Sequence, residues 1–99
     1  MNIEKMMKDL QRMQSKLQDE IETLEVEATS GGGLVTARMS GKKDLLGLTL
    51  SAEAITPDDP GMLADLIVAA VNAAGHKVDA ELERKTQGLA GGLKIPGRS

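Results

Sequence analysis

Residues 3–24 read IEKMMKDLQRMQSKLQDEIETL, and the spacing of their apolar side chains decides the fold. Apolar residues recur every seven positions, with methionines at the alternate positions, in a series that comprises Ile3, Met6, Leu10, Met13, Leu17 and Leu24. Met7 and Ile21 widen the same face. Such a seam is typical of a helix that packs along its length against a partner helix. We therefore predict one long helix from Ile3 to about Leu24.

The opposite side of this helix carries a basic stripe. At about 100° per residue, four bases fall within roughly 80° of one another, and they are Lys5, Lys8, Arg12 and Lys16. This order opposes the helix dipole, which favours acids at the start and bases at the end, and it sets like charges four residues apart. A solvated face accounts for many charge stripes. A stripe that opposes the dipole and its own neighbours indicates an anionic partner.

The composition is that of one small domain. The chain has 99 residues and contains no Phe, Tyr, Trp or Cys. A core without aromatic residues is of marginal size, so we expect self-association to complete it. The sequence predicts one domain over residues 1–90 and a flexible, Gly-rich basic tail over residues 91–99. The lack of Cys fits the cytosol, and no apolar run resembles a signal peptide or a membrane span, so the expected location is cytoplasmic.

The charges are unevenly distributed along the chain. A net charge of −3 argues against a generic basic nucleic-acid binder. However, residues 1–16 hold four bases and two acids, and residues 84–99 hold four bases and no acid. Residues 17–30 hold five acids and no base. If the two long helices run antiparallel, the two basic ends meet at one tip, and the acidic segments gather nearer the sheet.

Three strand patterns follow the first helix. Residues 26–29 and 34–39 alternate in polarity around Ser30–Gly33, which predicts a hairpin with positive φ angles. A phosphate-binding loop would need a following helix and a Lys-Ser/Thr pair, and the sequence has neither here. Residues 45–51 place three leucines on one face. Tight turns between these strands predict a three-stranded antiparallel meander with one apolar face that a helix must cover.

A second long helix is predicted from about Pro60 to Thr86. Asp58 or Asp59 is suited to cap it, and Pro60 is suited to its first position. Capping explains the Asp pair better than a metal site does, since no other ligand cluster lies nearby. Arg84 and Lys85 near the end of this helix complement its dipole and so have a structural explanation. Gly88–Gly92 is expected to end the helix.

The sequence offers little chemistry for catalysis. His76 is the only histidine and there is no cysteine, so neither a zinc site nor a Cys–His pair is expected. We interpret the chain as a non-enzyme without cofactor, metal or small-molecule substrate. Without aromatic side chains, stacking on unpaired bases is not available. Lysine and arginine on a rigid helix suit the phosphates of duplex DNA, which they contact without reading the sequence.

Four segments together resemble the YbaB/EbfC family of nucleoid-associated proteins. The first helix contains Met6-Met7-Lys8 and Gln11-Arg12-Met13-Gln14. Residues 31–35, GGGLV, are similar to the Gly-x-Gly-Leu-Val hairpin of the family. Residues 63–72, LADLIVAAVN, are similar to its Leu-x-Asp-Leu-Ile-x-Ala-Ala-x-Asn stretch, and residues 91–97 resemble its Gly-rich ending with Pro-Gly. Two departures are Lys94 in the tail and the absence of a Gly-rich leader before the first helix.

The resemblance implies an α+β protein of α-β-β-β-α order, with a three-stranded meander, two long helices and a tweezer-like homodimer. Its partners would be double-stranded DNA and a second copy of the chain, with no membrane, and its location the nucleoid. It implies DNA-binding residues on both helical arms, namely Lys5, Lys8, Arg12, Lys16, Arg84 and Lys85. An alternative from the residues themselves is a protein-binding adaptor or chaperone-like clamp that uses the Met-rich first helix.

Overall fold

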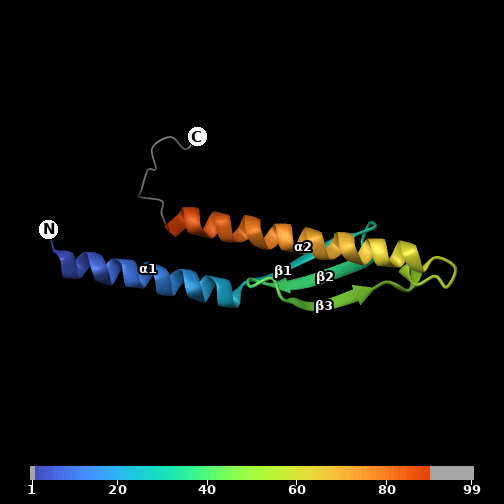
Figure 1. Cartoon of the computed structure of the whole chain (residues 1–99), viewed down its shortest axis with the longest axis horizontal. Coiled ribbons are helices and arrows are strands. Elements are labelled where there is room, and N and C mark those ends of the chain that lie inside the picture. Colours follow the sequence, from blue (N-terminus) through green and yellow to red (C-terminus); the bar gives the residue numbers. More distant parts are fainter. Residues whose placement is uncertain (1, 90–99) are drawn as a thin grey trace, which may run out of the picture.

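The computed structural model describes residues 2–89, and its elements follow the predicted α-β-β-β-α order (Figure 1). The three strands form one antiparallel sheet in the order β1-β2-β3. The α+β prediction is therefore confirmed. The elements are α1 (Ile3–Thr23), β1 (Glu25–Ser30), β2 (Val35–Ser40), β3 (Leu45–Leu50), a short 3₁₀ helix η1 (Ala52–Ala54) and α2 (Pro60–Leu89).

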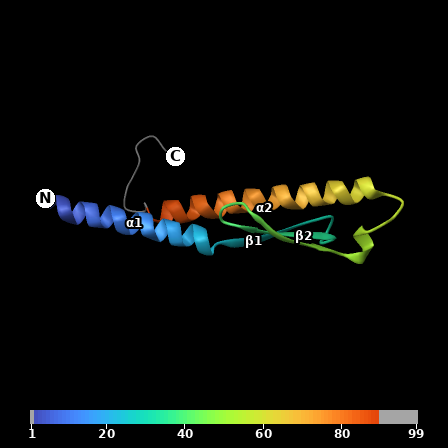
Figure 2. The ribbon, with the colours of Figure 1, turned by 60° about the horizontal axis from the view of Figure 1, so that its bottom comes forward.

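Helix α1 begins at a side-chain cap and ends where the sheet begins. The Asn2 Oδ1 accepts a hydrogen bond from the Glu4 amide at 3.1 Å, which satisfies one free donor of the first turn. Leu24 is extended and leads directly into β1. With this single residue as connection, α1 continues away from the end of the sheet and does not cover its face (Figure 2). No residue of α1 is fully buried.

The core lies between α2 and the first two strands. The strands contribute Val26 and Ala28 of β1, together with Val35, Ala37 and Met39 of β2. Opposite them, α2 contributes Ala70, Ala74 and Val78, all fully buried. Because two of these three side chains are alanines, the helix backbone can approach the sheet closely. The other sheet face carries the polar Thr36 and the Arg38–Glu25 ion pair and stays in solvent, as in antiparallel sheets covered on one side.

The predicted glycine hairpin is confirmed. Gly31, Gly32 and Gly33 all have positive φ angles, at 60°, 70° and 101°. Residues other than glycine rarely adopt this backbone region, so three consecutive glycines permit a turn that few other residues could form. The turn is also tied to α2, because the Ser30 hydroxyl donates a hydrogen bond to the Leu66 carbonyl at 2.6 Å.

Strand β3 lies outside the area that α2 covers, and this corrects an expectation from the sequence. Leu48 pairs with Ala37 and Leu50 with Val35, so both leucines lie on the same sheet face as α2. Yet α2 packs mainly on β1 and β2. The leucines of β3 remain 36–45% exposed. One helix is narrower than three strands spaced about 4.8 Å apart, so the third strand is left without cover.

The bounds of α2 agree with the prediction at its start and differ at its end. The helix begins at Pro60, and the Asp59 Oδ1 accepts a hydrogen bond from the Met62 amide at 3.0 Å, so Asp59 is the cap. The helix continues to Leu89, past the predicted end at Thr86. A single Gly88 costs about 1 kcal/mol in a helix, which is too little to end one that is already propagating. The predicted tail over residues 91–99, with Lys94 and Arg98, lies outside the described residues.

Gly41 is the point where α1 meets the β2–β3 turn. Its amide donates a hydrogen bond to the Leu24 carbonyl at 3.0 Å, and the residue is buried. A Cβ atom at this position would collide with the backbone carbonyl of Ile21 and approach the Leu24 Cβ. Backbone atoms cannot yield as a flexible side chain does. The close approach therefore sets how the arm formed by α1 is attached to the sheet.

We predict that Gly41→Ala lowers the free energy of unfolding by about 1–3 kcal/mol, the usual cost of overpacking, measured by urea unfolding followed by circular dichroism. Gly47→Ala is the matched control. Its added Cβ would meet only the Arg38 side chain at 3.7 Å, so stability should stay within about 0.5 kcal/mol of the parent. Equal effects of the two substitutions would contradict the tight contact at Gly41.

Candidate nucleic-acid interface

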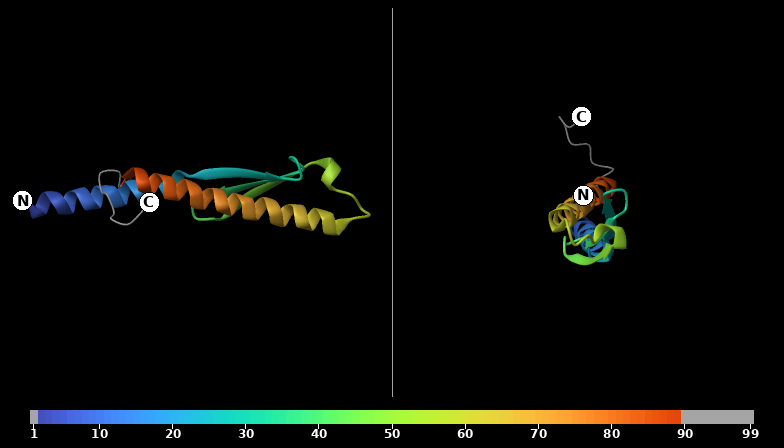
Figure 3. Two further views of the ribbon diagram at one scale, coloured as in Figure 1. Left: turned by 90° about the horizontal axis from the view of Figure 1, so that it is seen from above. Right: turned by 90° about the vertical axis from the view of Figure 1, so that its right-hand side faces the viewer.

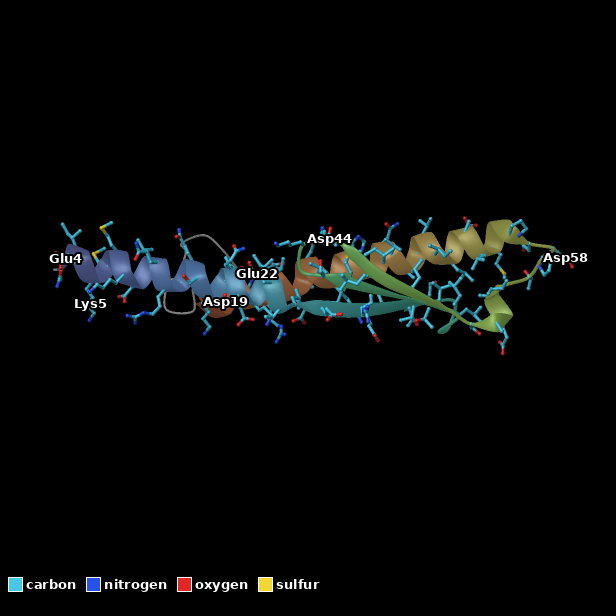
Figure 4. The ribbon with its side chains drawn as sticks, turned by 90° about the horizontal axis from the view of Figure 1, so that it is seen from below. Glu4, Lys5, Asp19, Glu22, Asp44 and Asp58 are labelled. Atoms are coloured by element: carbon cyan, nitrogen blue, oxygen red, sulfur yellow. The ribbon has the colours of Figure 1, made fainter. Side chains whose placement is uncertain are left out.

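The first half of α1 projects from the body of the protein as a free arm. Every residue from Asn2 to Arg12 is exposed. Figure 4 shows Glu4 and Lys5 at the free end, whereas Asp19 and Glu22 lie nearer the sheet. Lys5, Lys8, Arg12 and Lys16 are all exposed. The structure thus places the predicted basic stripe on a rigid helix that solvent surrounds over its first half.

The bases of this stripe have no carboxylate partner in the described part of the chain. The ion pairs formed among residues 2–89 are Arg38–Glu25, Lys43–Asp79, Arg84–Glu81 and Lys85–Glu20, so none uses a base of α1. Arg12 and Lys16 border a shallow hollow of about 250 Å³ together with Asp9 and Met13. The N-terminal end of the helix dipole adds further positive potential to the arm. Four positive charges outside any ion pair of residues 2–89, on one side of a helix, form a surface that attracts anions.

The two predicted bases of α2 are already paired. The Lys85 Nζ donates to the Glu20 Oε2 of α1 at 2.7 Å, with both side chains about 30% exposed. The hydrogen bond and the positive charge of Lys85 lower the pKa of Glu20, with a smaller contribution from Lys16. The Arg84 Nη2 donates to the Glu81 Oε2 at 2.6 Å, which raises the pKa of Arg84. Lys85 therefore joins α2 to α1, while Arg84 is 71% exposed and projects from the helix.

The expectation that the start of α1 meets the end of α2 is wrong. The helices run in opposite directions but are staggered, so the end of α2 lies beside Glu20 and α1 continues past it (Figures 1 and 3). The reason is length. Helix α2 spans 30 residues, or about 45 Å, and it starts beyond the far end of strands that are each about 20 Å long. Only its last turns extend past the sheet to reach α1.

Sequence reasoning missed Glu20 as a member of this contact. Glu20 lies three residues after Leu17, at a position of the seven-residue repeat that is otherwise apolar. An acid in an apolar seam is a signal for a basic residue on the facing helix. The pattern could have indicated the ion pair, although it could not have identified Lys85 as the partner.

Other classes of site find little support among residues 2–89. This part of the chain has no group of three or more His, Asp or Glu side chains able to hold a metal ion. His76 is exposed on α2. None of the helices within these residues is long and apolar enough to cross a membrane. The exposed bases of α1 are therefore the best candidate for a binding site.

Comparison with known proteins places the chain in a family. The profile of the YbaB/EbfC DNA-binding family matches residues 1–93. The chain belongs to this family. A nucleoid-associated protein of Clostridium novyi is 43% identical over 100 residues, covering 98% of this chain and 88% of that protein. One from Brucella ovis is 45% identical over 96 residues, covering 97% of this chain and 90% of that protein.

A solved structure shares the fold. The crystal structure of an uncharacterized protein from Helicobacter pylori superposes with a TM-score of 0.63 and covers 82% of this chain and 94% of that one. At 17% sequence identity, this likeness concerns the fold alone. The family membership confirms the resemblance read from the four sequence segments, and it makes DNA the expected partner of a chain that does not belong to a known enzyme family.

The Glu20–Lys85 pair predicts an acid-dependent stability. Because the folded state lowers the pKa of Glu20 from 4.5, the pair stabilises the fold above about pH 4.5 and loses its effect as the pH falls through the lowered value. Lys85→Gln should therefore lower the melting temperature at pH 7 and make it fall less steeply between pH 5 and pH 3. Thermal unfolding by circular dichroism measures both. Addition of Glu20→Gln to Lys85→Gln should change the acid dependence little further, and identical acid dependence of parent and Lys85→Gln would show that the pair is not formed.

Proposed function

We propose that this protein is a homodimer that binds duplex DNA largely without sequence specificity through the basic face of α1. The observation that carries the proposal is the set of four exposed bases, without carboxylate partners, on an arm that projects from the body. Lysine and arginine on a helix suit phosphates, which position a protein on DNA without reading base sequence. The absence of aromatic residues disfavours stacking on single strands.

The proposed second copy would cover the apolar surface of β3. Leu46, Leu48 and Leu50 are exposed on this strand, and Ile55 beyond it is 55% exposed. Exposed apolar patches of this kind are typical of interfaces. A two-fold axis at this edge would bury the patch against its own copy. The dimer would then present two α1 arms, as in the tweezer-like arrangement expected for the family.

The bases of α2 would have separate roles in this dimer. Lys85 would hold α1 in place through Glu20 and would contribute to DNA binding mainly by positioning the arm. Arg84, which is 71% exposed, could exchange Glu81 for a phosphate. Such a protein would act in the cytoplasm on the bacterial nucleoid, organise DNA there and thereby influence transcription. It would need no cofactor and catalyse no reaction.

The DNA-binding proposal is tested with the triple variant Lys5→Gln/Lys8→Gln/Arg12→Gln. Binding to several duplexes of unrelated sequence should weaken to a similar extent, measured by gel shift or fluorescence anisotropy at two or more salt concentrations. In a plot of the logarithm of the association constant against the logarithm of the salt concentration, the slope should become less steep by roughly 0.9 for each phosphate that the variant no longer neutralises. Unchanged affinity and salt slope would show that the stripe does not contact DNA.

A variant with the same loss of charge serves as control. Arg38→Gln/Lys42→Gln/Lys43→Gln removes three bases from the sheet and its turn and leaves α1 intact. It should retain most of the affinity if the arm makes the contacts, whereas equal weakening would indicate attraction by overall charge. If the unmodified protein does not bind duplex DNA at moderate salt, the alternative function of a protein-binding adaptor is favoured. Its binding surface would be the exposed methionines of the arm.

Dimerisation is tested at β3. Leu48→Lys places a charge in the apolar patch and should shift the protein from dimer to monomer in sedimentation or light-scattering measurements. The control Glu53→Lys changes an exposed residue of η1 and should leave the dimer unaffected. A Leu48→Lys variant that remains dimeric at micromolar concentration would place the dimer interface elsewhere.

A further inference from the structure

The arm has a second surface, apolar, on the side opposite its bases. Ile3, Met6, Met7 and Leu10 are 71%, 50%, 57% and 58% exposed, and α2 ends too early to cover them. Exposed apolar residues are common singly. Here four lie on one face of about two helical turns and continue the seam that α2 contacts further along α1. An apolar seam with a seven-residue repeat is complementary to another helix with the same repeat.

We propose that this surface pairs antiparallel with the same surface of α1 in a second molecule. In the register that leaves no polar residue in the seam, Ile3 faces Met13 of the second copy, and Met6 faces Leu10. Met7 then lies beside Met7 of the second copy, next to the two-fold axis. This register forms four apolar layers from the two arms, in which Ile3, Met6 and Leu10 are exposed and Met13 is half-buried.

The stagger between the two helices makes room for this pairing. On α1, the ion pair with Lys85 places α2 beside Glu20, and the last four residues of α2, up to Leu89, extend about one turn further along α1. In the antiparallel register, the corresponding part of the second molecule lies beyond the N-terminal end of the first arm. The bodies of the two molecules are therefore at opposite ends of the paired helices and do not compete for space. A parallel pair would place both bodies at the same end, where each already occupies the seam of its own α1.

The charges are compatible with simultaneous DNA binding. Lys5, Lys8 and Arg12 lie on the far side of the helix from the seam, at positions that face solvent in a two-stranded coiled coil. They would stay accessible to phosphates in the paired state. The one unfavourable contact is Asp9, which flanks the seam and would lie near Asp9 of the second copy. Removal of this charge should strengthen the pairing.

The pairing would link molecules that already bind DNA. Three helical turns form an interface smaller than the roughly 1,200 Å² of a stable complex, so the association would be weak in free solution and favoured when molecules are concentrated on one duplex. A protein that pairs with itself through both β3 and the arm would form chains of dimers. This consequence rests on the proposed function, whereas the arm-to-arm contact itself requires no DNA.

The test uses cross-linking without DNA. Since the chain contains no Cys, single cysteines can be introduced at Met7→Cys on the proposed axis and at Lys8→Cys, a matched control on the opposite face. Both are made together with Leu48→Lys, so that pairing through β3 does not contribute. A short bismaleimide should join Met7→Cys chains into covalent dimers at concentrations where Lys8→Cys gives few. Circular dichroism verifies that each variant is folded.

Two further substitutions should change the cross-linked fraction in opposite directions. Leu10→Glu in the Met7→Cys protein should lower the association constant for arm-to-arm pairing roughly tenfold and so reduce the cross-linked fraction. Asp9→Asn in the same protein should increase this fraction. Equal cross-linking at the two cysteines, or no response to Leu10→Glu, would overturn the proposal. Because no DNA is present, a positive result stands even if duplex binding fails, and a negative result leaves the DNA-binding proposal intact.

Discussion

The packing of α2 across β1 and β2 is the contact on which the rest of the structure depends. Ala70 and Ala74 let the helix approach the sheet closely, and Val78 extends the buried seam toward α1. From there α2 continues beyond the sheet and reaches Glu20 through Lys85. A shorter helix would leave α1 attached only through Leu24 and the contact with Gly41. The length of α2 therefore decides how much of α1 is held and how much is free to bind a partner.

The two helices use charge in different ways. In α2 the acidic cap lies at the start, as the helix dipole favours, and Arg84 and Lys85 form ion pairs. Because α2 continues to Leu89, the two bases lie before its last turn, and the dipole explanation predicted for them does not apply. In α1 the bases lie at the start and have no such partners among the described residues. Their arrangement costs some helix stability. In the proposed function, the phosphate backbone of DNA would supply the negative charge that these bases lack.

Much of the fold was predictable because local rules apply to it. The glycine hairpin, the cap at Asp59 and the alternation of the strands depend on a few neighbouring residues. The uncovered leucines of β3 and the stagger of the helices were not predicted. They depend on how wide a helix is relative to a sheet and on where a connector places the start of α2. The basic stripe of the candidate site was found from helical spacing alone, while the pairing of Lys85 with Glu20 was not.

The sequence by itself determined the order of the elements, the two faces of α1 and the family, since these follow from periodicity, turn residues and local motifs. Only the tertiary structure decided that Lys85 forms an ion pair with another helix. Arg84 lies beside Glu81 because residues three apart are neighbours on one helix, whereas Lys85 lies against Glu20 only because α2 packs beside α1. An ion pair between residues 65 positions apart depends on where two helices end in space, and no local pattern contains that information.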